Sequence, residues 1–197
     1  GREPQSILFE EEANKMKKFV ALLLAVLMVA SLCACGQKDK GSDLQTVTKG
    51  KLTMSTNAQF PPYESVADDG KGYEGTGFEG IDIEIAYALA QKLGLELVVD
   101  DMDFDSALSA VQTGKSDIVA AGVTVTPERQ NTMSFTDSYA NGVQVVIVKE
   151  GSDIKSIDDL EGKKIGTQRG TTGFIYCSDD YGDDNVIGFD DGATAVQ

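Results

Sequence analysis

The length, composition and charge of the chain are those of a globular protein and exclude several kinds of site. Its 197 residues are 41% hydrophobic, which suits one or two compact domains. Seventeen basic and 32 acidic residues give a net charge of −15, and such a surface repels the phosphates of nucleic acids. The chain contains no His, which excludes His-dependent metal sites and Ser/His/Asp triads. We therefore expect no nucleic-acid partner and no metal.

An apolar stretch near the N-terminus has the layout of a bacterial export signal. Met16 is followed by two lysines, and residues 19–30 are all apolar, a run shorter than the ~20 residues that span a bilayer. The stretch ends in the letters LCAC, which resemble the point at which a lipoprotein signal is cleaved and a Cys receives lipid. We expect residues 16–34 to be a lipoprotein signal peptide and Cys35 to be lipidated. An ordinary signal peptide or a membrane anchor helix is the alternative.

The segments on either side of this signal differ in character from the body of the chain. Residues 1–15 precede a complete signal sequence, so we expect them to be translated upstream sequence, with Met16 as the true start. Residues 35–50 are polar and contain Gly, Ser, Lys and Asp, a composition typical of a flexible tether. Two of the three cysteines lie in the signal stretch, so Cys177 is the one thiol of the body and no internal disulfide is expected.

From residue 51 onward, segments typical of strands and helices alternate. Apolar residues at helical spacing followed by a Gly predict the helix over 81–93. Strands are predicted over 51–56, 95–99, 117–123, 143–148, 164–167 and 186–189. Further helices are predicted over 106–113 with Asp105 as N-cap, from Thr126–Pro127 onward, over 156–160, from 172 onward and at 192–197. This alternation predicts α/β layers with mostly parallel sheets.

Two motifs resemble the sequence patterns of known binding sites, but the residues around or within them do not meet the requirements of those sites. Residues 75–80 fit G-x-G-x-x-G, but the dinucleotide fingerprint must directly follow a buried strand, and here a polar loop precedes it. Residues 179–185 (DDYGDDN) have the composition of a calcium loop without its ligand spacing, which favours a solvated acidic turn.

The segment 122–129 (GVTVTPER) is the best local candidate for a ligand site. A predicted strand ends there and a predicted helix begins, so free N–H groups and the helix dipole favour an anion. Arg129 lies one turn into that helix and can clamp a carboxylate with two charge-assisted hydrogen bonds. A surface Arg beside an ordinary helix cap explains the local sequence equally well.

Five separated motifs follow one another from residue 51 onward: KLTMSTNAQFPPYE (51–64), EGIDIEIAYALAQKLG (79–94), MDFDSALSAVQTGKSDIVAAGVTVTPER (102–129), SFTDSYANGVQVVIVK (134–149) and LEGKKIGTQRGTTG (160–173). With these motifs in this order, the chain resembles the family 3 (polar amino acid) extracellular solute-binding proteins of ABC importers from about residue 51 to its last residue. This resemblance implies a two-lobed, type II periplasmic-binding-protein-like α/β clamshell that closes over its ligand. On that pattern, residues 51–140 form lobe 1, and residues 141–197 form a crossing strand and an incomplete lobe 2.

The resemblance also implies which residues hold the backbone groups of an amino acid. Arg129 is expected to clamp the α-carboxylate, and Thr124 to add a hydroxyl and a backbone contact. Gly122 is expected to offer its carbonyl to the α-ammonium. From lobe 2, Thr171 and Thr172 are expected to donate to the carboxylate when the lobes close. The family's lobe-2 aspartate, which pairs with the α-ammonium, is expected beyond the last residue of this chain.

Four further residues are expected to surround the side chain of the ligand. Phe60 and Phe104 are implied to enclose its aliphatic part between two rings. Asn57 and Gln168 occupy positions at which relatives often contact the side chain of the ligand. Because both residues are uncharged, they disfavour a strictly basic ligand.

The function implied is transport: an importer's binding component that is not an enzyme and needs no cofactor. Its partners would be a small amino-acid ligand, a membrane ABC permease and, through its lipid, the membrane, with the protein itself a monomer. It would lie outside the cytoplasm, anchored to the cell membrane, or in the periplasm of a Gram-negative source. The alternatives are a dehydratase or lyase on the same fold, for which Glu64 and Glu79 are the candidate cleft acids, and the sensor domain of a receptor.

Overall fold

A computed structural model of the chain describes residues 44–197. The predicted signal peptide, Cys35 and most of the predicted tether lie outside these residues. Among residues 44–197, none of the helices combines the length and hydrophobicity needed to cross a bilayer.

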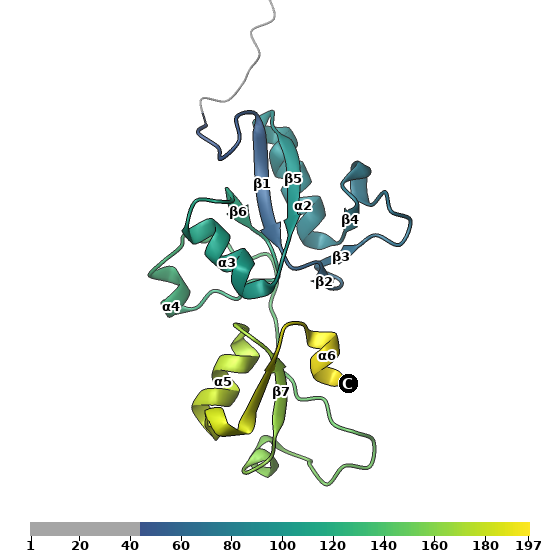
Figure 1. Ribbon diagram of the computed structural model, residues 1–197, viewed down its shortest axis with the longest axis vertical. Coiled ribbons are helices and arrows are strands. Elements are labelled where there is room, and N and C mark those ends of the chain that lie inside the picture. Colours follow the sequence, from purple (N-terminus) through teal and green to yellow (C-terminus); the bar gives the residue numbers. More distant parts are fainter. Residues whose placement is uncertain (1–43) are drawn as a thin grey trace, which may run out of the picture. The chain divides into compact units, whose positions relative to one another are not determined.

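A three-stranded parallel sheet is built around β1 (Lys51–Thr56) (Figure 1). β1 lies between β5 (Glu96–Asp101) and β6 (Ile118–Val119), with Met54 opposite both Val99 and Ile118. β1 lies where the sequence predicts it, and β5 begins one residue later than predicted and ends two residues later. β6 covers only two residues of the predicted strand 117–123, because pairing with β1 is limited to that stretch.

The helices α2 (Ile81–Leu93) and α3 (Phe104–Gln112) contact this sheet. α2 ends as predicted at Gly94, whose left-handed φ of 70° suits a residue without a Cβ. α3 begins two residues earlier than predicted. The N-cap is Asp103 and not Asp105, because the buried Phe104 already belongs to the first turn.

The core lies between β1 and α2. Met54, Ile83 and Ala86 are at most 1% exposed and form one cluster, against which Leu97 and Ile118 pack. A second cluster joins Leu52, Ala90 and Leu95. Both clusters place the apolar face of α2 on the sheet, which explains why the helical spacing over residues 81–93 predicts the helix.

A small antiparallel sheet was not predicted from the sequence. It consists of β2 (Gln59–Phe60), β3 (Glu64–Val66) and β4 (Phe78–Glu79), with the single turn η1 (Tyr73–Gly75) before β4. The region reads as loop because strands of two or three residues are too short to show a period, and because the prolines at 61 and 62 occupy the turn between β2 and β3.

The C-terminal part contains a second, two-stranded parallel sheet with its own helices. Its elements are η2 (Ile157–Leu160), β7 (Ile165–Gln168), α5 (Thr172–Tyr181), η3 (Asp183–Asn185), β8 (Val186–Phe189) and α6 (Gly192–Val196). β7 and β8 pair in parallel, and α5 and α6 contact both strands. β8 has the predicted bounds, while β7 begins and ends one residue later than predicted.

The segment 143–148, which the sequence predicts as a strong strand, forms no strand in the structure. Its apolar side chains are exposed, up to 85% for Val143 and 73% for Ile147. Strand propensity alone was misleading here, because a strand also needs a neighbour for its backbone groups, and residues 44–197 supply none at this point.

Candidate functional site

The connection from β6 to α4 (Pro127–Gln130) forms the centre of the candidate site. Thr126 caps α4 as predicted: its side chain accepts a hydrogen bond from the Arg129 amide at 3.2 Å, and Pro127 is the first helical residue. Gly122 has a φ of +55°, a left-handed conformation that favours glycine. The backbone on either side of Thr124 is therefore defined by a left-handed glycine and by a capped helix start.

Arg129 is buried in this turn, at 8% exposure. Its Nη1 donates to the carbonyl oxygen of Thr124 at 2.7 Å, and its Nη2 donates to the carbonyl oxygen of Gly170 at 2.9 Å. The guanidinium carbon lies 5.6 Å from the centre of the Phe104 ring, within cation–π range. Arg129 thus links Thr124 and Phe104 to Gly170, which sequence reasoning did not include in the site.

The charge of Arg129 has no carboxylate partner at ion-pair distance among the residues that the structure describes. Within residues 44–197 the ion pairs are Lys51–Glu96 and Arg169–Asp190, and neither involves Arg129. Burial lowers the pKa of Arg129 and the charge of Asp105 raises it, but a guanidinium stays protonated in proteins. Because buried charges are usually paired, this arrangement is suited to receive an anion.

The two predicted aromatic walls differ in environment. Phe60 is 48% exposed and stacks on Tyr63, with ring centres 5.3 Å apart and planes 12° from parallel. It also lies against Gly122, where a Cβ would be 2.8 Å from Phe60 Cε1. Phe104 is 8% exposed and lies under the Arg129 guanidinium. Phe60 therefore offers a free ring surface, whereas Phe104 supports the charged group.

The two predicted side-chain readers contact each other. Gln168 Nε2 donates to Asn57 Oδ1 at 2.9 Å, and Asn57 Nδ2 donates to the carbonyl oxygen of Met102 at 2.9 Å. Asn57 is 3% exposed. The structure thus brings these two residues together.

The two predicted threonine donors lie at the start of α5. Thr171 is the N-cap: its Oγ1 accepts from the Phe174 amide at 3.2 Å and donates to the Gln168 carbonyl oxygen at 2.7 Å. Thr172 Oγ1 donates to Gln144 Oε1 at 3.2 Å. Both hydroxyls therefore have partners within the chain, at a helix start where free amides favour an anion.

Behind the turn lies Asp82, which sequence reasoning missed. It is fully buried in the first turn of α2, and its Oδ2 accepts from the Gly122 amide at 2.7 Å. Its Oδ1 accepts from the Tyr139 hydroxyl, also at 2.7 Å. An Asp in the first turn of a helix is common because of the helix dipole, so no signal in the sequence separated this one from an exposed residue.

The two acids considered for catalysis lie in different surroundings. Glu64 is fully buried, and neither of its carboxyl oxygens has a hydrogen-bond partner in the described part of the chain. Burial, and after it the charge of Asp82, raise the pKa of Glu64 to about 9, so it is protonated at neutral pH. Glu79 is exposed in β4. Glu64 therefore does not reach a cleft surface, contrary to the prediction.

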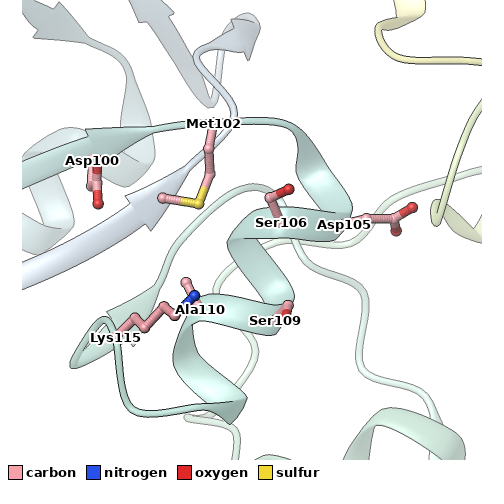
Figure 2. A pocket seen from close by; sticks show the side chains of 7 residues that line it. All are labelled: Asp100, Met102, Asp105, Ser106, Ser109, Ala110 and Lys115. Atoms are coloured by element: carbon pink, nitrogen blue, oxygen red, sulfur yellow. The ribbon is translucent and has the colours of Figure 1, made fainter.

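A separate hollow lies beside α3. It is lined by Asp100, Met102, Asp105, Ser106, Ser109, Ala110 and Lys115 (Figure 2). Figure 2 shows Asp105 at the start of α3, pointing away from Met102 and Lys115. The hollow contains none of the predicted ligand-binding residues, and its lining combines one Lys with acidic and hydroxyl groups.

Comparison with known proteins places the chain in a family. Residues 52–195 match the family described as bacterial extracellular solute-binding proteins, family 3. The arginine-binding extracellular protein ArtP of Bacillus subtilis (strain 168) is 39% identical over 156 residues, which are 79% of this chain and 57% of ArtP. The chain thus spans less than two thirds of the length of this relative.

Solved structures agree with this relationship. An ancestral arginine-binding protein bound to glutamine matches with a TM-score of 0.68 and 39% identity, over 76% of this chain and 64% of that chain. The ancestral amino acid-binding protein AncCDT-1, a precursor of cyclohexadienyl dehydratase, matches with a TM-score of 0.65 and 33% identity, over 75% of this chain and 64% of that chain. The predicted two-lobed α/β fold class is confirmed. The chain belongs to the family 3 bacterial extracellular solute-binding proteins.

Proposed function

We propose that this chain captures an amino acid outside the cytoplasm for an ABC importer, holding the ligand by its α-carboxylate. The observation that carries the proposal is Arg129, a buried cation without a carboxylate partner in the described residues. A ligand carboxylate would supply the missing charge and accept two parallel hydrogen bonds.

The neighbouring groups suit the remaining atoms of an amino acid. Within the part of the chain that the structure describes, two of the five N–H donors of Arg129 bond to Thr124 and Gly170, so three remain for a ligand. Gly122 would accept from the α-ammonium, and Thr171 and Thr172 would donate to the carboxylate once the lobes close. Because Thr171 and Thr172 already donate to Gln168 and Gln144, closure must redirect their hydroxyls or use the backbone amides of α5.

The side chain of the ligand is proposed to be uncharged and polar, or acidic. Asn57 and Gln168 are neutral amides, and Phe60 adds an exposed aromatic surface. The competing ligand is arginine, which the name of the relative ArtP makes the first alternative. A basic side chain would need a carboxylate beside the amides, and Asp105, close to Gly170, is the candidate.

The location and partners follow from the same proposal. We propose that the chain is exported by residues 16–34, attached to lipid through Cys35, and docked as a monomer on a membrane permease. The acidic surface, at a net charge of −15, favours solubility and disfavours binding to nucleic acid.

The enzymatic alternative deserves one test because AncCDT-1 is a precursor of a dehydratase. A dehydratase needs an acid or base within reach of its substrate. Glu64 has the raised pKa of such a group but is fully buried, which supports binding without catalysis. Incubation of the protein with each amino acid that it binds, followed by mass spectrometry, is expected to return the ligand unchanged.

Thermal unfolding against the common L-amino acids tests the proposal. The protein is expressed from the whole reading frame that contains these 197 residues, without its signal peptide. A ligand present at 100 times its dissociation constant stabilises the folded state by about 2.7 kcal/mol, which is readily detected. We expect a shift with at least one uncharged polar or acidic amino acid and a smaller shift with arginine. The absence of a shift with every amino acid would refute the proposed function.

A further inference from the structure

Asp82 makes two short hydrogen bonds to two distant parts of the chain. Its Oδ2 accepts from the Gly122 amide and its Oδ1 accepts from the Tyr139 hydroxyl, both at 2.7 Å. Hydrogen bonds of this length are typical of charged acceptors. Each oxygen therefore has a hydrogen-bond donor, and the side chain is fully buried at the start of α2.

The hydrogen bond from the Gly122 amide to Asp82 restrains a residue that has no side chain of its own to make contacts. Gly122 has a φ of +55° and is covered by Phe60. The Gly122 amide belongs to the planar peptide unit that joins residues 121 and 122. A hydrogen bond to this amide therefore orients one of the two peptide planes that meet at Gly122. Glycine is also the residue with the largest backbone freedom to lose, so an external anchor is effective here.

α2 is itself held at the same place. The amides of Ile81 and Asp82 donate to the carbonyl oxygens of Pro62 and Tyr63, at 3.1 and 2.9 Å. The carboxylate of Asp82 therefore projects from a helix start whose position is set by the turn that carries Phe60. Hydrogen bonds thus connect the start of α2 both to the turn that carries Phe60 and to the backbone of Gly122.

We propose that Asp82 is a positioning residue for the ligand site: by accepting from the Gly122 amide it fixes the turn that leads to Arg129, and through Tyr139 it holds the chain where it leaves lobe 1. The proposal rests on the proposed function, because it assigns to Asp82 the geometry of that same site. Asp82 itself touches no ligand and acts through Gly122.

The surroundings of Asp82 favour this role over a simple buried charge. In the described part of the chain Asp82 forms no ion pair with a Lys or Arg, and its acidic neighbour Glu64 is fully buried. Its two donors are an amide of the candidate site and the hydroxyl of a half-exposed Tyr139. A group that served only to stabilise α2 would need neither contact.

Two substitutions separate position from charge. In Asp82→Asn the amide oxygen accepts from Gly122, while the nitrogen donates to the Tyr139 oxygen, so both contacts survive without the charge. In Asp82→Ala both are lost. Ile83→Val is the matched control, because Ile83 is the adjacent, fully buried residue of α2 and belongs to the core cluster with Met54.

The first readout needs no ligand. In the full chain, the Gly122 amide is observed by ¹H–¹⁵N NMR and by hydrogen exchange. We expect Asp82→Ala to move its proton resonance upfield and to speed its exchange, and Asp82→Asn and Ile83→Val to change both much less. An unchanged Gly122 amide in a folded Asp82→Ala variant would overturn the proposal.

The second readout is affinity, measured by calorimetry with L-glutamine and L-arginine on the protein from the whole reading frame. Asp82→Ala is expected to weaken binding about tenfold or more, the factor that corresponds to losing a hydrogen bond to a charged group, and Asp82→Asn to restore it to within about threefold. Equal losses of affinity in Asp82→Ala and Ile83→Val would show that general destabilisation causes the effect, and would overturn the proposal. If the unaltered protein binds neither amino acid, the proposed function fails for these two ligands, and the Gly122 amide still decides whether Asp82 holds the turn.

Discussion

Replacement of Arg129 by Ala is expected to abolish ligand binding while leaving the fold intact. Among residues 44–197, two of the five guanidinium donors have acceptors, which leaves three for a ligand, enough for two parallel hydrogen bonds to a carboxylate. Each hydrogen bond to a charged group contributes ~1.5–3 kcal/mol, so the loss of two weakens binding by roughly 3–6 kcal/mol. A loss of this size corresponds to a dissociation constant that rises by about 10² to 10⁴.

The cost of Arg129→Ala to stability is expected to be much smaller. The Thr124 carbonyl that Arg129 contacts belongs to an exposed residue, so water can replace the guanidinium. Arg129→Lys keeps the charge but loses the fork, and we expect it to bind with intermediate affinity. Arg169→Ala is the matched control, because Arg169 is exposed and pairs with Asp190 at 3.6 Å.

Titration calorimetry with the amino acid that gives the largest thermal shift measures these effects, and urea unfolding measures stability. Binding by a folded Arg129→Ala variant at an affinity within a few-fold of the unaltered protein would refute the reasoning, since the carboxylate would then be held elsewhere. A loss of binding in Arg169→Ala of similar size would show that the effect is not specific to the buried guanidinium.

Three further predictions concern stability. Gly122→Ala is expected to lower the melting temperature more than Gly50→Ala, because both have positive φ but only Gly122 places a Cβ against Phe60, and equal shifts would contradict this. Thr126→Ala is expected to lower the free energy of unfolding, measured in urea, by about 1 kcal/mol, whereas Thr126→Ser retains the cap and should lower it less. Equal losses in the two variants would show that the cap contributes nothing. The pKa of Glu64 is raised from 4.5 to about 9 in the fold, so stability should fall as pH rises between these values, and Glu64→Gln should flatten this decline. An equally steep decline in the Gln variant would exclude Glu64 as its source.

The parts of the fold that the sequence predicts well are those decided by local patterns. The helix over 81–93 has both an apolar face and a Gly stop, and the structure has the same bounds. Thr126 and Pro127 likewise mark the start of α4, because a cap and a proline act within a few residues. Such features need no knowledge of distant contacts.

The features that the sequence did not predict depend on distant partners. Residues 143–148 have a strong strand propensity, yet their backbone finds no neighbouring strand within the described chain. Burial of Asp82 depends on Gly122 and Tyr139, which lie 40 and 57 positions away. No local pattern encodes such separations, so the residue most closely coupled to the candidate site was missed.

The candidate site itself could be assembled only from a resemblance to a family. Local sequence left Arg129 evenly balanced between a carboxylate clamp and a surface residue. Its 8% exposure excludes a surface residue, and the contact with Gly170 links it to a segment 41 positions away. The roles of Asn57, Gln168 and the two threonines toward a ligand stay predictions.

The most direct test of the account compares an amino acid with its α-carboxamide. The two ligands share the ammonium group and the side chain, and differ in the charge that Arg129 is proposed to neutralise. In calorimetry with the protein from the whole reading frame, we predict that the carboxamide binds about 100-fold more weakly or not at all, as expected for the loss of a charge-assisted pair of hydrogen bonds. Equal affinity for the two would contradict the proposal that Arg129 holds a carboxylate.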